Sequence, residues 1–213
     1  MSAGFVTAAD LQLQLGGIPL ERIRLVPPPG MATDDDAMSV MDREGRTCEV
    51  IDGVLVEKAM GYFESRLAIV IAYFIERFLD GQDLGIVLGS DGLLRISSTR
   101  SRAPDVSFLN WSKFPNRQLP AEPVPNLVPD LAVEVISQGN TRAEMEAKLD
   151  EYFAAGVQIA WIIDPNRESA VVYEARDVAV AIDMEGTLTA PAVLPGFTVS
   201  MRELFNRAGN RKS

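Results

Sequence analysis

Alternating and helical patterns of apolar residues divide the chain after residue 47 into short strands and two long helices. The runs CEVI and VLVEK are separated by Asp52-Gly53, a dipeptide that favours a two-residue hairpin turn. Apolar residues then recur at helical spacing from Gly61 to Leu79, and Gly81 follows as a stop signal. The runs GIVLG, LLRIS and APDVSFL predict three further strands.

The second half of the chain alternates between strands and one long helix. The irregular, proline-rich segment 113–129 is followed by LAVEVIS, which is almost wholly apolar, as expected for a central strand covered on both faces. Thr141 and Glu144 have the spacing of a capping box, and the helix that they begin is expected to end near Gly156. The strands QIAWIID and SAVVYEA follow, then weaker strands and a short helix near 201–206. This order predicts an α/β (α+β) fold with a mixed sheet flanked by helices.

The first 46 residues lack this regularity and are interpreted as an N-terminal extension. They contain a short amphipathic segment, a run of three prolines and the acidic run Asp34-Asp35-Asp36, which is typical of a solvated face or a helix N-terminus. We therefore expect one folded domain over residues 47–207, preceded by the extension 1–46 and followed by a polar tail at 208–213.

Composition and charge exclude several classes of chemistry. The 213 residues include 20 Lys and Arg against 30 Asp and Glu, and the net charge of −10 argues against a generic basic nucleic-acid coat. The absence of His excludes Ser/His and Cys/His dyads and His-ligated zinc. The lone Cys48 cannot form an internal disulfide, so a reducing cytoplasm fits best. No signal peptide or membrane-spanning apolar stretch is visible, and we expect a cytoplasmic protein.

Three acidic residues occupy positions where a charge is costly. Glu134 is the only charge within LAVEVI, and an ionised group in a doubly covered strand needs a nearby partner. Glu64 falls in the middle of the apolar side of the first long helix, although a first-turn acid can also serve the helix dipole. Asp105 begins a strand after Pro104 and shares a face with Ser107. A structural ion pair with an arginine is the open alternative for Glu134 and Glu64, and for Asp105 the alternative is a residue that only ends a turn and starts the strand.

One lysine lies where it could join these acids. Lys148 borders the inward stripe of the helix that begins near Thr141, where a snorkelling surface lysine is the common alternative. Three carboxylates with an ammonium beside them would form an oxygen-ligand site for Mg²⁺ or Mn²⁺. The natural reaction of such a site is attack of water on a phosphodiester, with the metal polarising phosphoryl oxygen and the lysine stabilising the developing charge.

The chain resembles the Uma2 family of restriction endonuclease-like proteins, a branch of the PD-(D/E)xK nuclease superfamily. The matching stretches, which span most of the core, are CEVIDGVLVEKAMG, APDVSFL, PDLAVEVIS, EAKLDEYFAAG and IAWIIDPNRESAVVYE. The resemblance implies a restriction-endonuclease-like sheet, with Asp105 as the aspartate of the PD motif and Glu134 as the second acid. Ile136 replaces the usual lysine two residues later, and the resemblance implies that Lys148 takes its role. It also implies that Glu64 is the acid offered by the first helix.

The resemblance implies DNA as the substrate, so the predicted function is a divalent-metal-dependent endonuclease. Five basic residues surround Asp105 in sequence and could hold a phosphate backbone beside the metal: Arg95, Arg100, Arg102, Lys113 and Arg117. A catalytically inactive binding or regulatory module is the alternative, suggested by Ile136 and by the acidic net charge. Family resemblance and the two strands of a duplex also lead us to expect a homodimer.

Overall fold

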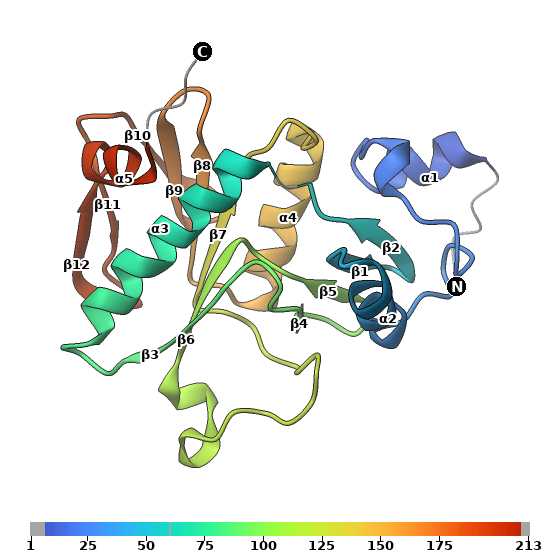
Figure 1. Cartoon of the computed structure of the whole chain (residues 1–213), viewed down its shortest axis with the longest axis horizontal. Coiled ribbons are helices and arrows are strands. Elements are labelled where there is room, and N and C mark those ends of the chain that lie inside the picture. The colour runs from blue at the N-terminus through green and yellow to red at the C-terminus, as the bar shows by residue number, and fades with distance from the viewer. Residues whose placement is uncertain (1–6, 60, 210–213) are drawn as a thin grey trace.

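The computed structural model describes residues 7–59 and 61–209 (Figure 1). The described α-helices are α1 (Ala8–Gln14), α2 (Asp34–Glu44), α3 (Tyr62–Leu79), α4 (Arg142–Ala155) and α5 (Met201–Ala208). Three short 3-10 helices are η1 (Leu20–Arg22), η2 (Trp111–Lys113) and η3 (Pro115–Arg117). The strands are β1 (Cys48–Ile51), β2 (Val54–Glu57), β3 (Gly85–Leu88), β4 (Leu94–Arg95), β5 (Arg100–Arg102), β6 (Val106–Asn110), β7 (Leu131–Val135), β8 (Ile159–Asp164), β9 (Ser169–Ala175), β10 (Val178–Ile182), β11 (Thr187–Ala190) and β12 (Leu194–Ser200).

A six-stranded mixed sheet with the order β10-β9-β8-β7-β6-β3 forms the centre of the fold. Neighbouring strands are antiparallel except for β7 and β8, which are parallel and are connected through α4. β7 is buried along its whole length, as predicted for a central strand. The expected α/β architecture, a mixed central sheet flanked by helices, is confirmed.

The two faces of β7 carry different side chains because successive residues of a strand point to opposite sides. Leu131, Val133 and Val135 lie in the apolar core that includes α3 and the C-terminal elements. Ala132 and Glu134 contact residues of α4 on the other side. Figure 1 shows α3 crossing one side of the sheet and α4 lying behind it. The charged residue of β7 is therefore directed toward α4.

β1 and β2 form the predicted hairpin and belong to a second sheet with the order β2-β1-β5-β4. The turn residues Asp52 and Gly53 have φ values of 49° and 76°, the left-handed conformations that a two-residue hairpin turn requires. A Cβ at position 53 would also come within 2.5 Å of the backbone of Gly30, so only glycine fits there. The turn thereby docks the N-terminal segment on the hairpin.

Three of the described helices, α1, α2 and α4, begin with a capping box. In α4 the Thr141 side chain accepts a hydrogen bond from the backbone of Glu144, whose own side chain accepts one from the Thr141 backbone. Gly156, with φ of 105°, ends α4 as predicted. The acidic run that begins at Asp34 forms the first turn of α2, one of the two interpretations that its composition allowed.

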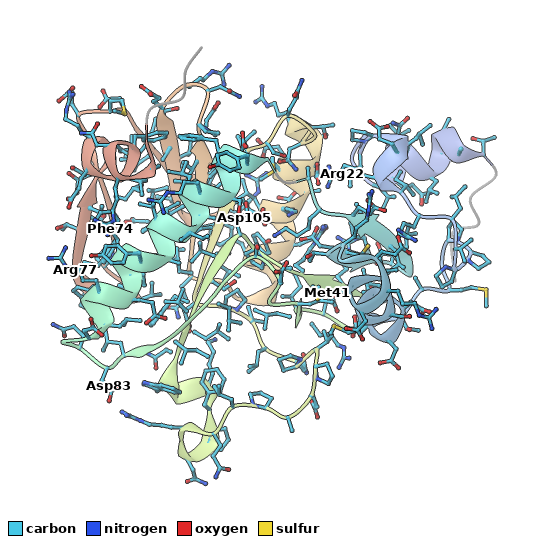
Figure 2. The ribbon with its side chains drawn as sticks, viewed as in Figure 1. Arg22, Met41, Phe74, Arg77, Asp83 and Asp105 are labelled. Atoms are coloured by element: carbon cyan, nitrogen blue, oxygen red, sulfur yellow. The ribbon has the colours of Figure 1, made fainter. Side chains whose placement is uncertain are left out.

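The predicted extension 1–46 is described from residue 7 onward, and this part packs against the rest of the protein. Leu11, Ile18 and Ile23 form a buried apolar cluster with the β1–β2 hairpin. Arg22 donates two hydrogen bonds to the carboxylate of Glu144, at 2.9 and 2.7 Å. Figure 2 shows Arg22 between α1 and α4. Residues before position 47 therefore share a core with the predicted domain.

The C-terminal elements complete the core on the α3 side. β11 pairs with β12, and buried residues of α5 pack in the same cluster as α3. α5 continues to Ala208, so the short helix predicted near 201–206 is slightly longer than expected. Of the predicted polar tail 208–213, residues 210–213 lie outside the described range. Among the described residues, no helix is both long and apolar enough to cross a membrane.

We expect Arg22→Ala to lower the free energy of unfolding by about 3–5 kcal/mol, because Glu144 would stay buried without its cation. Urea denaturation followed by circular dichroism measures this change. Arg46→Ala is the matched control, since Arg46 is 61% exposed and its ion pair with Glu57 should contribute little. Equal, small effects of both substitutions would show that the N-terminal segment is not anchored through Arg22.

Candidate functional site

β6 and β7 place two of the predicted acids side by side. Val106 pairs with Val133 in the antiparallel ladder, so the next residues outward, Asp105 and Glu134, are cross-strand neighbours. Both side chains are buried, and Asp105 Oδ2 accepts a hydrogen bond from the backbone N–H of Val135 at 2.8 Å. Figure 2 places Asp105 near the middle of the molecule. Two carboxylates that are distant in sequence thus meet on one side of the sheet.

Lys148 reaches Glu134 from α4. Its Nζ donates to both carboxylate oxygens of Glu134, at 3.0 and 3.1 Å, and lies 3.1 Å from Oε1 of Glu49. The side chain is only 3% exposed, so Lys148 is not a surface lysine. Burial by itself would lower the pKa of Lys148, but the carboxylates of Glu134 and Glu49 outweigh burial and raise the pKa. The ammonium therefore stays charged. It can stabilise negative charge, but it cannot accept a proton as a general base.

Glu49 is a site residue that the sequence analysis missed. It lies in β1, where Oε2 accepts a hydrogen bond from Nη1 of Arg102 at 2.7 Å and Oε1 accepts one from the backbone N–H of Ala103 at 3.2 Å. Burial would raise the pKa of Glu49, but Lys148 and Arg102 lower it further than burial raises it. A signal was available, because Glu49 is the only charge in the run CEVI, as Glu134 is in LAVEVI.

Lys58, which follows β2, is a second lysine at the site. Its Nζ donates to Oδ1 of Asp105 at 3.0 Å, to the carbonyl oxygen of Ser90 at 3.1 Å, and to the carbonyl oxygen of Ala103. The side chains of Lys58 and Asp105 are each 5% exposed. Both oxygens of the Asp105 carboxylate therefore have a donor, one from the backbone of β7 and one from Lys58.

These residues form one connected group of buried charges, which we call the buried charge cluster: Glu49, Lys58, Arg102, Asp105, Glu134 and Lys148. It contains three carboxylates and three cations, and at its edge Arg102 also pairs with Glu151, which a further cation, Arg100, contacts. Tyr152 adds an O–H that donates to Oε1 of Glu134. Burial raises the pKa of Glu134 against the opposing effect of Lys148, and the carboxylates of Asp105 and Glu49 raise it further. Additional positive charge beside Glu134 would therefore offset the burial and the repulsion that raise its pKa.

Glu64 approaches from a different side. It lies in the first turn of α3, the helix that covers the opposite face of β7, and it is 5% exposed. A Cβ on Gly61 would come within 2.0 Å of Oε2 of Glu64, so the carboxylate lies directly against the N-cap of its own helix. In residues 7–59 and 61–209, no three Asp, Glu, Cys or His side chains gather closely enough to hold a metal ion. The described geometry thus joins Asp105 with Glu134, and the role of Glu64 stays a prediction.

The structure removes one residue from the expected phosphate-binding basic patch, because Arg102 is buried. The other four form ion pairs within the protein but are partly exposed, and their contact with phosphate stays a prediction. Arg102 is 2% exposed and belongs to the buried charge cluster. The other pairs are Arg95 with Asp34, Arg100 with Asp52 and Glu151, Lys113 with Asp130, and Arg117 with Asp83. Their charges are locally neutralised, which a count of basic residues along the sequence does not reveal.

A cavity of about 750 Å³ lies away from the buried charge cluster. It is lined by the start of α2, the Asp52-Gly53 turn and the segment that connects β4 to β5. None of the four predicted site residues lines it. Its two arginines, Arg95 and Arg100, are already paired with carboxylates, so they offer no uncompensated positive charge to a ligand.

Comparisons with known proteins agree with this architecture. The model of the Uma2 family, described as "Putative restriction endonuclease", matches residues 34–202. No curated protein matches the chain. Among solved structures, the crystal structure of "a putative nuclease belonging to DUF820" from Anabaena variabilis ATCC 29413 is similar, with a TM-score of 0.68 and 19% identity over 76% of this chain and 91% of that chain. At this identity the likeness shows the fold. The family match covers most of the chain, including the whole buried charge cluster, and the protein therefore belongs to the Uma2 family.

Proposed function

We propose that this protein is a divalent-metal-dependent endonuclease that hydrolyses phosphodiester bonds in DNA. The observation that carries the proposal is the pairing of Asp105 with Glu134 on adjacent strands, with Lys148 Nζ 3.0 Å from Glu134. DNA enters the proposal through the family description, restriction endonuclease. The chain's own contribution is a buried, charged site that matches the chemistry of phosphodiester cleavage.

The residues present fit a hard divalent cation. Mg²⁺ keeps several waters and is usually bound through one or two carboxylates together with substrate phosphates, so two neighbouring acids suffice. Asp105 and Glu134 are the residues that would hold it, because their mutual repulsion is part of what raises the pKa of Glu134. When bound there, Mg²⁺ or Mn²⁺ supplies Lewis acidity toward phosphoryl oxygen and lowers the pKa of water.

The chain's own groups would then act in defined ways. Lys148 keeps a permanent positive charge at the site and would stabilise negative charge that develops on the phosphate. Tyr152 and Lys148 orient Glu134, and the backbone N–H of Val135 orients Asp105. Glu64, in the first turn of α3, is the third acid that the family resemblance implies.

Two further properties belong to the proposal. A cytoplasmic location is supported by Cys48, whose thiol is buried and whose pKa is raised to about 11 by burial, as suits a free cysteine that stays reduced.

A homodimer is supported by β10, an edge strand of the central sheet with exposed Val178 and Val180.

Asp105→Asn and Glu134→Gln should each lower DNA cleavage in Mg²⁺ or Mn²⁺ by about 100-fold or more, because each removes a charged ligand from the site. Asp130→Asn is the matched control. Asp130 also follows a proline and is also buried, but it pairs with Lys113 away from the cluster. Nicking of supercoiled DNA measures activity, and circular dichroism confirms folding. A folded wild type that binds DNA but never cuts it, with binding retained in every variant, would support the inactive module instead.

Calorimetric titration should show Mn²⁺ binding to the wild type and much weaker binding to Asp105→Asn and Glu134→Gln. The physical reason is that each substitution removes one of only two carboxylates expected to hold the ion. Glu64→Gln in the same titration tests the third acid. If Glu64 is a metal ligand, the variant should bind Mn²⁺ more weakly, and if Glu64 only interacts with the helix dipole, its Mn²⁺ affinity should equal that of the wild type. Undiminished Mn²⁺ binding by both Asp105→Asn and Glu134→Gln would refute the proposed site.

Light scattering should report twice the 23.2 kDa mass of the chain. Val180→Lys should shift the protein toward the monomer, because a lysine on an edge strand opposes pairing with a second strand. Leu119→Lys is the control, since Leu119 is an equally exposed apolar residue outside β10. A monomeric wild type at working concentration would remove the dimer from the proposal.

A further inference from the structure

We propose that the ammonium of Lys58 competes with a divalent ion for one carboxylate oxygen of Asp105. Lys58 binds this oxygen when no metal is present and is displaced from it when the ion binds. The competition lowers the affinity of the site for the metal. The inference rests on the proposed function, because it takes Asp105 and Glu134 as the metal ligands. It concerns a residue that neither the sequence pattern nor the family resemblance singled out.

The surroundings of Lys58 Nζ have the ligand chemistry of a hard cation. The ammonium donates to the carboxylate of Asp105 and to the carbonyl oxygens of Ser90 and Ala103, and its side chain is 5% exposed. Carboxylate and carbonyl oxygens are also the ligands that hard divalent cations accept. The lysine thus fills a place where buried oxygen atoms converge on one positive charge.

Asp105 has only one oxygen for which a metal can compete. Oδ2 accepts the backbone N–H of Val135 at 2.8 Å, a bond that fixes the carboxylate to β7. Oδ1 accepts Lys58 Nζ at 3.0 Å. Binding through Oδ2 would cost the buried N–H of Val135 its acceptor, whereas binding through Oδ1 displaces a lysine that can find water. The metal is therefore expected to compete with Lys58.

The charge balance of the buried charge cluster favours the same exchange. Three carboxylates are matched by Lys58, Arg102 and Lys148, and Glu151 beside Arg102 also pairs with Arg100. A divalent ion added to this set would leave an excess of two positive charges in a buried region, which is costly. Release of one lysine to solvent halves the excess.

Of the cations in the cluster, Lys58 is the one whose release breaks the fewest ion pairs. Lys148 is held by Glu134 and Glu49, and Arg102 is held by Glu49 and Glu151. Lys58 has a single carboxylate partner and lies in the connector between β2 and α3. Its backbone N–H donates to the carbonyl of Thr47 at 3.0 Å, so the flexible four-carbon side chain can swing while the hairpin stays in place.

The test is Mn²⁺ titration of the 213-residue wild type, Lys58→Met and Lys58→Gln by calorimetry, with thermal unfolding in parallel. We expect both variants to bind Mn²⁺ about tenfold more tightly or better than the wild type, because the competing cation is gone. We also expect Mn²⁺ to raise their Tm by more than it raises that of the wild type. Lys58→Arg keeps the positive charge and should restore the weaker binding. Lys113→Gln, which removes a lysine paired with an aspartate elsewhere, should bind as the wild type does.

Each outcome separates this inference from the proposed function. Equal Mn²⁺ affinity of the wild type and folded Lys58→Met and Lys58→Gln overturns the role of Lys58 and leaves the metal site intact. Weaker binding by both variants also overturns it, and shows instead that Lys58 is needed to keep Asp105 in place. Absence of Mn²⁺ binding in the wild type with binding in the variants supports competition strongly. Absence of binding in all of them removes the metal site, and the inference with it.

Discussion

An ionised carboxylate inside a central apolar strand has to be compensated by other charges, and Glu134 imposes this constraint on the surrounding structure. Its strand is buried on both faces, so the compensating charge has to come from α4, which supplies Lys148. Lys148 in turn contacts Glu49, which ties the β1–β2 hairpin and Arg102 to the same point. One buried charge thereby connects the central sheet, the second sheet and the helix between β7 and β8.

The fold was largely predictable because local signals agreed with the packing. The Asp52-Gly53 turn, the capping box at Thr141 and the stop at Gly156 each depend on a few adjacent residues, and each lies where the sequence indicated. The N-terminal segment was not predictable in this way. Its contribution comes from scattered residues such as Ile18 and Arg22, whose partners are far along the chain. Spacing within a segment carries no information about such contacts.

The candidate site was predictable in part, in two of its acids and one of its lysines. A charge within an apolar strand is visible in the sequence, and the structure brings Asp105, Glu134 and Lys148 together. Their further partners were not visible. Lys58 follows a strand as an ordinary polar residue would, and Arg102 counts equally as a surface cation until its burial is known. A long basic side chain can extend toward many different partners. The sequence therefore shows the charge of such a residue but not the carboxylate with which it pairs.

The ion pair between Arg22 and Glu144 shows that the region that packs together in the folded protein is longer than the region that the family model matches. The family match begins at residue 34, whereas Arg22 and the apolar residues around it lie before that position. A fragment cut at the homology boundary would uncover the β1–β2 hairpin and leave a carboxylate at the start of α4 without its guanidinium. Because Glu49 lies in that hairpin and Lys148 in that helix, residues outside the family match hold in place both of the elements that carry these site residues.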